Sequence, residues 1–369
     1  MEIKMILTNG FDPDPRVYKE AKALLGNGYD VEILCWDRDN RYIDKQSEQY
    51  DGIKITRFFP KSAYGSGYKQ LYSYWQFITQ IKRYLKKHTY DVIHAHDIDG
   101  VIIGLFVKKT AKLVWDMHEF YDGFNSSGIR KFFLEKIAKE CFRKSDGIIY
   151  VSDSQKERYE VKKVRNTPDV IVMNAPEGVL FNGFRRTSSD KLRISFIGSL
   201  REFDTLKKLM DIGEKYKDIT INLNGAGVAY KELKALQPLY RNTNITGKFH
   251  YKDIKKYYEN TDIIFAVYDS KLINVKYAFP VKGLEAIASG TPIITNKNTS
   301  FGDFVSINDI GFTVDEYNEL ELEELIKKIS DNKELLKIKS ENLTKIKEKF
   351  KWDEHSNNLI KFYQKLIEI

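Results

Sequence analysis

A short segment around residue 280 combines the residue types that bind a phosphate group. Pro280 precedes Val281, Lys282 and Gly283, and Glu285 follows one helical turn later. A proline suits a helix start, where the leading N–H groups have no partner inside the helix. Those N–H groups lie at the positive end of the helix dipole, so together with the lysine they predict an anion site that the glycine lets a ligand approach. We expect the glutamate to accept hydrogen bonds from vicinal hydroxyl groups, such as those of a ribose.

An ordinary amphipathic helix is the alternative interpretation of the same segment. Gly290 would end that helix, and the next residues, Thr291 and Pro292, would begin a strand. Because a glycine stop is common at helix ends, composition alone does not decide between the two interpretations.

Histidines and carboxylates follow two other predicted strands. His94, His96 and Asp97 end the strand predicted at 92–96, and His118 follows the strand predicted at 112–117. A His-x-His pair at a strand end can bind zinc. Only six histidines occur in the chain, however, and no nearby cysteine completes such a site, so we expect no metal ion. His118 is either a ligand-facing residue, as its place after a strand suggests, or a core histidine; the simplest role for Asp97 is to cap the next helix.

The elements that position these residues alternate between strands and helices. Short β-branched runs predict strands at 3–8, 30–36, 53–58, 92–96, 112–117, 147–151, 170–173, 192–197, 220–224, 244–246, 263–267 and 292–295. Helices are predicted between most of them, for example at 15–27, 68–87, 129–144, 154–161, 204–216, 230–236, 251–259 and 281–289. This rhythm indicates α/β domains with parallel sheets, whose ligands lie beyond the carboxyl ends of the strands. A turn-rich stretch at 174–191 predicts the linker between two such domains, and the tail at 320–369 is expected to be helical throughout.

Composition narrows the class of protein. The chain has 369 residues, a net charge of +8 and only two cysteines, Cys35 and Cys141, which lie far apart in apolar segments. They predict buried, reduced thiols. No apolar stretch is long enough to cross a membrane and no signal peptide precedes the first predicted strand, so we expect a cytoplasmic protein. Neither half is basic enough to require a nucleic-acid partner.

One stretch is unusual, because residues 52–90 contain no acidic residue, eight Lys or Arg and ten aromatic residues. Core rings with a solvated basic end explain about half of the pattern. The rest of residues 57–87 would suit the surface of an anionic membrane, with rings at the interface and cations on lipid phosphates. Single-stranded nucleic acid would also suit rings and cations, but no RNA-binding signature accompanies them, and we expect no nucleic-acid partner.

The segment 280–294 resembles the signature P-x-K-x-x-E-A-x-A-x-G-x-P-V-I of family-4 glycosyltransferases. Further segments resemble the family in the same order, so that the resemblance covers nearly the whole chain: 14–17, 91–97, 116–119, 174–176 and 198–201. It implies the α/β GT-B fold, with two Rossmann-like, doubly wound domains facing across a cleft. The predicted domains are 1–180, which binds the acceptor, and 190–350, which binds the donor. The helix at 352–369 resembles the family's closing helix and is expected to pack back on the first domain.

The resemblance also implies roles for individual residues. Glu285 would bind the ribose, and Lys248 would lie near the base. The diphosphate would be bound by Val281, Lys282, Gly283 and Arg201, and by Gly10 from the other domain, although Gly10 is equally a plain turn glycine. His118 would contact the transferred sugar near its reacting carbon as the catalytic residue. The residues expected to bind the acceptor are Arg16, His96 and Asp97.

The implied activity is that of a metal-independent hexosyltransferase that retains anomeric configuration. A nucleoside-diphosphate sugar, with UDP favoured, would be its donor and no further cofactor is expected. The acceptor would be a hydroxyl of a glycan or lipid-linked molecule in surface polysaccharide synthesis, at the inner face of the cell membrane. Many family members carry a first glutamate where this chain has Tyr277. This difference leaves open a catalytically silent subunit that partners another transferase. A sugar-nucleotide epimerase of the same fold is a separate alternative, which would need additional carboxylates in the cleft.

Overall fold

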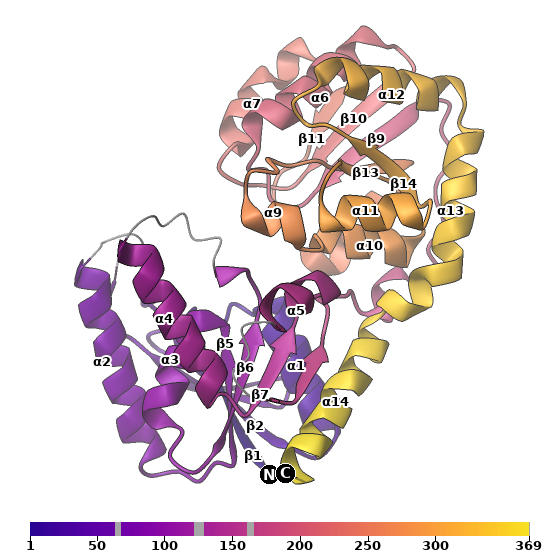
Figure 1. The fold of residues 1–369 in the computed structure, drawn as a ribbon. Coiled ribbons are helices and arrows are strands. Elements are labelled where there is room, and N and C mark those ends of the chain that lie inside the picture. The colour runs from indigo at the N-terminus through magenta and orange to yellow at the C-terminus, as the bar shows by residue number, and fades with distance from the viewer. Residues whose placement is uncertain (63–67, 122–128, 161–165, 369) are drawn as a thin grey trace. The chain divides into compact units, whose positions relative to one another are not determined.

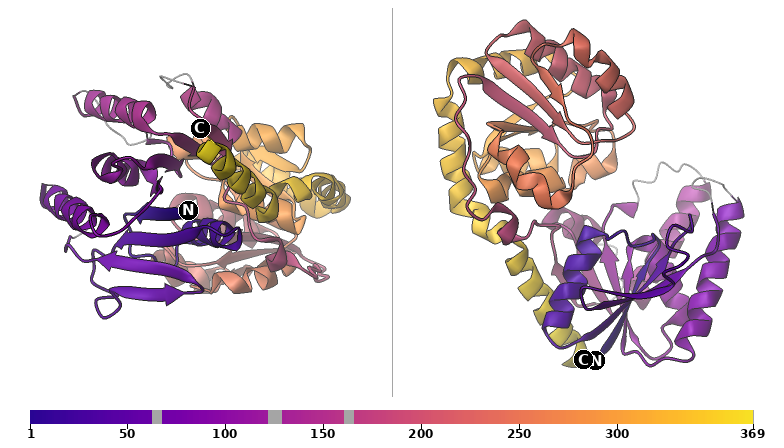
Figure 2. Two further views of the ribbon diagram at one scale, coloured as in Figure 1. Left: turned by 90° about the horizontal axis from the view of Figure 1, so that it is seen from below. Right: turned by 180° about the vertical axis from the view of Figure 1, so that it is seen from behind.

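The computed structural model describes residues 1–62, 68–121, 129–160 and 166–368. They form two compact units: unit 1 comprises Met1–Val172 and Ser356–Ile369, and unit 2 comprises Met173–His355. The sequence places the first boundary at 180, whereas the structure divides the chain at Val172. Within unit 1, the last helix returns beside the N-terminus (Figures 1 and 2).

Unit 1 is built on an eight-stranded sheet of order β3-β4-β2-β1-β5-β6-β7-β8. Its strands are β1 (Glu2–Leu7), β2 (Asp30–Trp36), β3 (Ser47–Tyr50), β4 (Ile53–Phe58), β5 (Val92–His96), β6 (Lys112–Met117), β7 (Gly147–Tyr150) and β8 (Asp169–Ile171). All neighbours pair in parallel except β3, which runs antiparallel to β4. The polar, mostly exposed sequence of β3 gave no strand signal. Strand order reverses at β1, which pairs with β2 on one side and β5 on the other.

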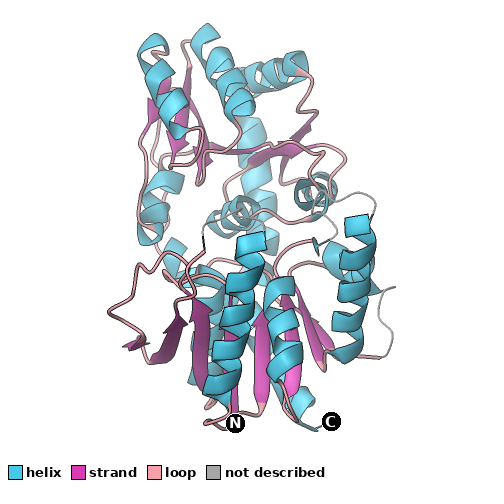
Figure 3. Ribbon diagram, turned by 90° about the vertical axis from the view of Figure 1, so that its left-hand side faces the viewer, coloured by secondary structure: helices cyan, strands magenta, loops and turns pink. Residues whose placement is uncertain are grey.

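Helices cover both faces of this sheet, as Figures 1 and 3 show. α2 (Tyr68–Leu85), α3 (Asp97–Val107) and α4 (Ile129–Lys144) lie on one face, while α1 (Pro15–Gly26) and α14 (Trp352–Glu368) lie on the other. The remaining helix is α5 (Asp153–Glu160). α1 begins as its sequence requires, because Asp14 accepts hydrogen bonds from the N–H groups of Arg16 and Val17.

Unit 2 contains a six-stranded, wholly parallel sheet of order β11-β10-β9-β12-β13-β14. Its strands are β9 (Leu192–Ile197), β10 (Ile219–Asn224), β11 (Thr243–Ile245), β12 (Ile263–Ala266), β13 (Ile293–Asn296) and β14 (Gly311–Val314). Its helices are α6 (Phe203–Lys215), α7 (Tyr230–Leu236), α8 (Ile254–Glu259), α9 (Ile273–Tyr277), α10 (Val281–Ser289), α11 (Ser300–Ile307), α12 (Glu319–Asp331) and α13 (Glu334–Ile346). Strand order reverses at β9, the same arrangement that β1 has in unit 1.

The tail is helical, as the sequence predicts, but its helices are separated by short breaks. It forms α12, α13 and α14, interrupted at Asn332 and by the 3-10 turn η5 (Lys347–Phe350). Three further 3-10 segments of the described residues, η2 (Gly178–Phe181), η3 (Gln237–Leu239) and η4 (Tyr251–Asp253), lie earlier in unit 2.

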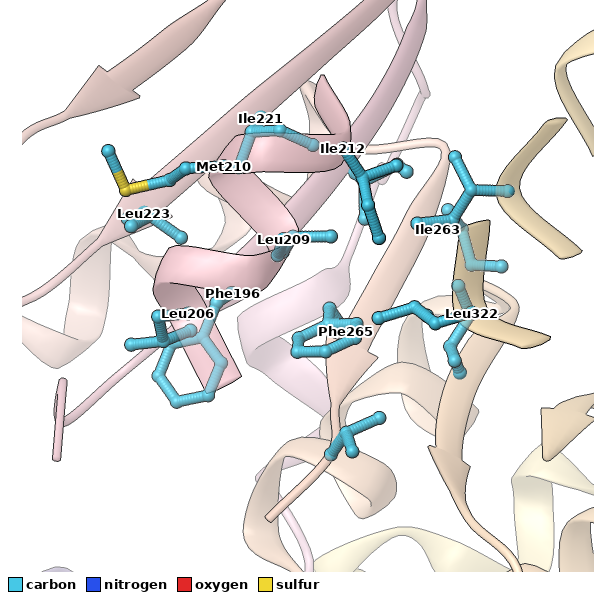
Figure 4. Close-up of a cluster of buried hydrophobic side chains, with 14 of the residues drawn as sticks. Phe196, Leu206, Leu209, Met210, Ile212, Ile221, Leu223, Ile263, Phe265 and Leu322 are labelled. Carbon is cyan, nitrogen blue, oxygen red and sulfur yellow. The ribbon is translucent and has the colours of Figure 1, made fainter. Parts of the chain in front are cut away.

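The core of unit 2 shows why its strands read as apolar runs. Figure 4 shows Phe196, Ile221 and Phe265 of the sheet facing Leu206 and Leu209 of α6. A parallel sheet is covered on both faces, so both sides of each strand are apolar. The successive residues of β12, Ile263–Ala266, are all fully buried as a result.

Two sequence predictions about the whole chain can be checked directly. Cys35 and Cys141 are free and buried, as expected, and burial raises the pKa of each thiol to about 12. Within the described residues, no helix is both long enough and apolar enough to span a membrane.

Candidate functional site

The start of α10 in unit 2 is open in the way that an anion site requires. Pro280 is the N-cap, no side chain caps the helix, and no acidic residue lies in its first turn. The N–H groups of Val281 and Lys282 have no backbone acceptor among the described residues. The sequence predicts a third free N–H at Gly283, but that group donates to the Pro280 carbonyl at 2.8 Å. Two amide donors, not three, are therefore available.

The side chain of Lys282 lies above the point where strand order reverses. Its Nζ is 4.3 Å from the ring centre of Phe196 in β9 and 5.5 Å from that of Tyr268, which follows β12. The half-buried ammonium forms no ion pair with any described residue. It is held by aromatic faces, so its charge is available to a ligand.

The loop after β9 carries Arg201 and passes close to this lysine. A Cβ added to Gly198 would lie 3.0 Å from the Lys282 Nζ, and a Cβ on Gly225 would lie 1.8 Å from the Gly198 carbonyl oxygen. Only glycine permits such an approach. The exposed Arg201 donates through Nε to the Ser199 hydroxyl at 3.1 Å. The structure thus brings the loop of Arg201 and the start of α10 together.

Glu285 is more deeply buried than the sequence suggests. It is 3% exposed, and its Oε2 accepts the Tyr258 hydroxyl at 3.0 Å. Burial, followed by the charge of Glu285, raises the pKa values of Tyr258 and Tyr251 well above the ordinary value. Sequence reasoning missed both tyrosines, because the place of Tyr251 in η4 and of Tyr258 in α8 next to Glu285 depends on how these segments pack against α10. The ribose role of Glu285 stays a prediction.

The other two donor residues proposed in unit 2 occupy different settings. A Cβ on Gly283 would lie 2.3 Å from Phe301, so the packing of α10 against α11 already requires glycine there. Lys248 is exposed and follows Gly247, whose φ is 84°. The next residue, Phe249, packs on Tyr257 of α8 with ring centres 4.6 Å apart. This loop therefore lies beside the helix that also carries the partner of Glu285.

Unit 1 has a pocket of about 650 Å³ at the carboxyl ends of β1, β2, β5 and β6. Gly10 lines it after β1, and a Cβ there would be 3.4 Å from Oδ1 of Asp37. Parallel sheets bind ligands at such a reversal of strand order. We call this cavity the acidic pocket, because seven carboxylates line it: Asp12, Asp14, Asp37, Asp39, Asp97, Asp99 and Glu119.

His118 lies between two carboxylates at the edge of the sheet. Its Nε2 is 2.7 Å from Oδ2 of Asp116, its Nδ1 is 3.5 Å from Oδ2 of Asp97, and its backbone N–H donates to Asp97 Oδ1 at 2.9 Å. Burial lowers the pKa of His118, but Asp97 and Asp116 outweigh burial and raise that pKa to about 9. A protonated imidazole with a partly exposed edge is thus held in place at neutral pH.

Asp97 holds His118 from a strained position rather than capping a helix. It is the first residue of α3, and the N-cap is His96, whose side chain makes no cap bond. The φ of Asp97 is 58°. Such a conformation costs a residue other than glycine about 1–3 kcal/mol and is frequent at functional sites.

Arg16, which we expect to bind the acceptor, is engaged inside the protein, and its acceptor role stays a prediction. It is 3% exposed and donates to both oxygens of Asp116, at 3.1 and 2.6 Å, and to the Val172 carbonyl at 2.7 Å. It also pairs with Glu20 at 3.0 Å. Its donors serve the protein itself, and these two carboxylates raise the pKa of Arg16 despite its burial.

His96 is also held by internal partners, and its predicted contact with the acceptor stays untested. It is 1% exposed, and its Nδ1 is 3.0 Å from both Asp116 Oδ2 and His118 Nε2. Burial and the neighbouring His94 lower the pKa of His96 to about 3, so it supports His118 as a neutral ring. His94 is likewise held from inside, by the Tyr363 hydroxyl at 2.7 Å.

The residue types around Asp116 could hold a metal ion. Glu20, His94, His96 and Asp116 present potential ligand atoms within 4.8 Å of one another, a grouping that spacing along the chain did not reveal. Arg16 nevertheless already places a positive charge between Asp116 and Glu20. A divalent cation would have to displace or oppose that charge, so the absence of a metal stays our prediction.

Comparison with known proteins gives two family matches. The model of glycosyltransferase family 4 matches residues 16–174, and that of glycosyl transferases group 1 matches residues 184–349. No curated protein sequence matched the chain.

Solved structures match over nearly the whole chain. Sucrose-phosphate synthase from Thermosynechococcus elongatus aligns with a TM-score of 0.80 at 14% identity, covering 100% of this chain and 99% of that one. A structure titled trehalose-6-phosphate from E. coli, bound with UDP-2-fluoro glucose, aligns with a TM-score of 0.74 at 10% identity, covering 100% and 99%. HepE from Anabaena in complex with UDP-glucose aligns with a TM-score of 0.73 at 14% identity, covering 98% and 99%. These likenesses show the fold.

Proposed function

The chain belongs to the family-4, group 1 glycosyltransferases with the GT-B fold, and from this membership we propose that it transfers a hexosyl group from a UDP-sugar to a hydroxyl of a glycan or lipid-linked acceptor. We propose further that the anomeric configuration is retained and that the acceptor belongs to surface polysaccharide synthesis. The donor class is supported by the UDP-glucose and UDP-2-fluoro glucose bound in two similar structures.

The observation that carries this proposal is the uncapped start of α10 beside the ammonium of Lys282, which pairs with no carboxylate of the described residues. A diphosphate gains negative charge as it leaves, and two free amides, a helix dipole and a lysine stabilise that charge. Arg201, on the adjoining loop, supplies a second cation that can form a charge-assisted hydrogen bond. Charge stabilisation of this kind needs no metal ion.

The transfer exchanges one bond at the anomeric carbon. The bond from that carbon to the diphosphate oxygen breaks, and its electron pair leaves with UDP. A bond forms from the acceptor oxygen to the same face of the carbon, and the acceptor proton passes to the departing phosphate oxygen. In this scheme the protonated imidazole of His118 donates a hydrogen bond to the transferred sugar and orients it.

Release of UDP tests the proposal. The protein is incubated with UDP- and GDP-sugars, with and without membrane extract, and free nucleotide is measured. We expect release from a UDP-sugar, a marked loss in Glu285→Gln, and little change in Glu232→Gln on α7. NMR coupling at the anomeric proton of the product should match that of the donor. Release from no donor would favour a silent subunit, and isomerisation of the donor without release would favour an epimerase.

A membrane-facing surface on α2 is a second part of the proposal. Within residues 57–87, of which 63–67 lie outside the described residues, α2 buries Phe77, Ile81 and Leu85 and exposes Leu71, Tyr72 and Trp75. Phe106 of α3, itself exposed, packs edge-on against Trp75. Exposed basic residues follow on the same helix and just beyond it: Lys82, Arg83, Lys86 and Lys87. Rings and cations in this arrangement suit an anionic lipid surface.

Vesicle flotation tests this surface. We expect binding to vesicles that contain phosphatidylglycerol, weak binding to phosphatidylcholine alone, and loss of binding in the double variant Leu71→Ser/Trp75→Ser. Ile307→Ser, on an exposed apolar position of α11, is the matched control. Equal binding by the double variant and the control would refute a membrane role for α2.

A further inference from the structure

The acidic pocket carries a charge opposite to that of the chain. The protein has a net charge of +8, yet among the described residues seven carboxylates and two guanidinium groups, those of Arg38 and Arg41, line this cavity. A concave wall of one sign concentrates the electrostatic field and acts on the charge of whatever enters. At about 650 Å³, the pocket is large enough for one or two sugar rings.

Two of the carboxylates retain open acceptor positions. Asp37 is 3% exposed; its Oδ2 accepts the Tyr42 N–H at 2.8 Å, while its Oδ1 has no donor among the residues that the structure describes. The carboxylate of Asp99 is exposed on the pocket wall and has no hydrogen-bond donor within the same set of residues. Both residues line the pocket, so the hydroxyl groups of a ligand could donate hydrogen bonds to these oxygens.

The features that would attract an anion lie next to carboxylates that oppose it. Asp14 caps the start of α1, and Asp97 and Asp99 lie in the first turn of α3, so neither helix start is open as that of α10 is. Arg41 pairs with Asp39 at 3.1 Å, and the charge of Arg38 acts on Asp99, where it opposes the burial that raises the pKa of that carboxyl group. A carboxylate or phosphate in this pocket would meet more like charge than opposite charge.

We propose that the acidic pocket binds the acceptor as an uncharged, hydroxyl-rich saccharide unit and discriminates against a unit that carries a carboxylate or phosphate. Asp37 and Asp99 accept the hydroxyl hydrogen bonds and set this selectivity. The inference rests on the proposed function, because it takes the ligand of the pocket to be the acceptor. Like charges brought together at a binding site weaken the wrong partner strongly.

Binding of three matched sugars tests the inference without any transfer reaction. p-Nitrophenyl β-glucoside, β-glucosaminide and β-glucuronide share one ring and differ by a neutral, an amine and a carboxylate substituent. Their dissociation constants are measured on the full chain by saturation-transfer NMR. We expect the glucuronide to bind at least about tenfold more weakly than the glucoside, and the glucosaminide to bind no more weakly than the glucoside.

Variants then identify the groups responsible. In Asp37→Asn/Asp99→Asn, the dissociation constant of the glucuronide should come within about threefold of that of the glucoside, because the amides are uncharged and do not repel the carboxylate. Asp303→Asn, at an exposed position of α11 in unit 2, should leave the ratio of the glucuronide and glucoside dissociation constants unchanged. Circular dichroism checks that the double variant folds, and Asp99→Asn alone gives a milder test if it does not.

The results separate this inference from the proposed function. The inference would be overturned if the glucuronide bound as tightly as the glucoside or more tightly, and if this binding were lost in Arg38→Met. It would also be overturned if the folded variants kept the wild-type ratio of the two dissociation constants, or if no sugar bound. If UDP release from UDP-sugars persists in that case, the proposed function stands. Glucoside selectivity in a protein that releases no nucleotide would support the inference while the transferase activity fails.

Discussion

Strand order reverses beside β1 in unit 1 and beside β9 in unit 2, and the two reversals carry opposite chemistry. In unit 1 the nearby cation, Arg16, is buried and bound to Asp116 and Glu20. In unit 2 the corresponding cation, Lys282, is half-buried over aromatic rings and pairs with no described carboxylate. The helix starts differ in the same sense, because Asp14 caps α1 and no side chain caps α10.

The difference shows how one sheet topology supports two kinds of site. A cation that its own carboxylates neutralise holds the fold together and adds nothing for an anionic ligand. A cation held only by ring faces keeps its charge for the ligand. The predictions below test whether Arg16 and Lys282 are divided in this way between stability and activity.

The largest expected effect is a loss of stability in Arg16→Met. Removal of the guanidinium leaves Asp116 and Glu20 buried without their partner, which should lower the free energy of unfolding by about 3–5 kcal/mol. Urea denaturation measures the change. Lys22 lies on the same helix as Arg16 and forms an exposed ion pair with Asp51, so Lys22→Met should lower the free energy of unfolding by under about 1 kcal/mol. Equal effects in the two variants would remove the structural role given to Arg16.

Lys282→Ala should lower activity and leave stability almost unchanged, the opposite of what we expect for Arg16→Met. Loss of its charge at the diphosphate should lower kcat/KM for UDP release by about 100- to 1,000-fold, the range seen when one transition-state donor is removed. The urea midpoint should move little, because no described residue pairs with this ammonium. Lys231→Ala, on the exposed side of α7, is the control. Activity near that of the control would show that the start of α10 does not hold the leaving group.

Alanine substitutions at Gly283 and Gly10 should show which of these glycines the packing of the fold requires. In Gly283→Ala the new Cβ would lie 2.3 Å from Phe301, and we expect a loss of about 1–3 kcal/mol in unfolding free energy. In Gly10→Ala the nearest atom, Oδ1 of Asp37, is at 3.4 Å, and stability should change by under about 0.5 kcal/mol. Phe301→Leu should partly rescue Gly283→Ala. A stable Gly283→Ala variant would contradict the packing role.

The smallest effect concerns the pKa of His118. In Asp97→Asn, this pKa should fall from about 9 by roughly one unit or more, because one stabilising carboxylate is lost. In the wild type the raised pKa stabilises the fold fully below the unfolded value of 6.5, and this contribution is lost as pH rises from 6.5 to about 9. In Asp97→Asn the pH range over which this contribution is lost becomes narrower, because its upper end, the pKa of folded His118, is lower. NMR titration of the imidazole measures both midpoints, and Asp39→Asn is the control. If the titration midpoint of His118 did not shift in Asp97→Asn, Asp116 alone would be responsible for the raised pKa.

The sequence determined the elements whose signals are local. Pro280 and Gly290 marked α10 at the residues where it begins and ends, and Gly290 has the left-handed φ of 68° typical of a helix stop. β-branched runs located most strands of both sheets, and the family signature fixed the GT-B fold. β3 and β14 were not predicted, because short strands depend on pairing with β4 and β13 more than on their own residues.

Only the tertiary structure decided which charged groups face a ligand and which face one another. Arg16 and Asp116 stand 100 residues apart in the chain, and the register of β5 against β6 places His96 beside Asp116. Motif position therefore assigned Arg16 and His96 to the acceptor, and only packing shows that both are partners of Asp116. Helix and strand signals act over a few neighbouring residues, but the pairing of buried charges depends on strand register and helix docking, which bring distant residues together.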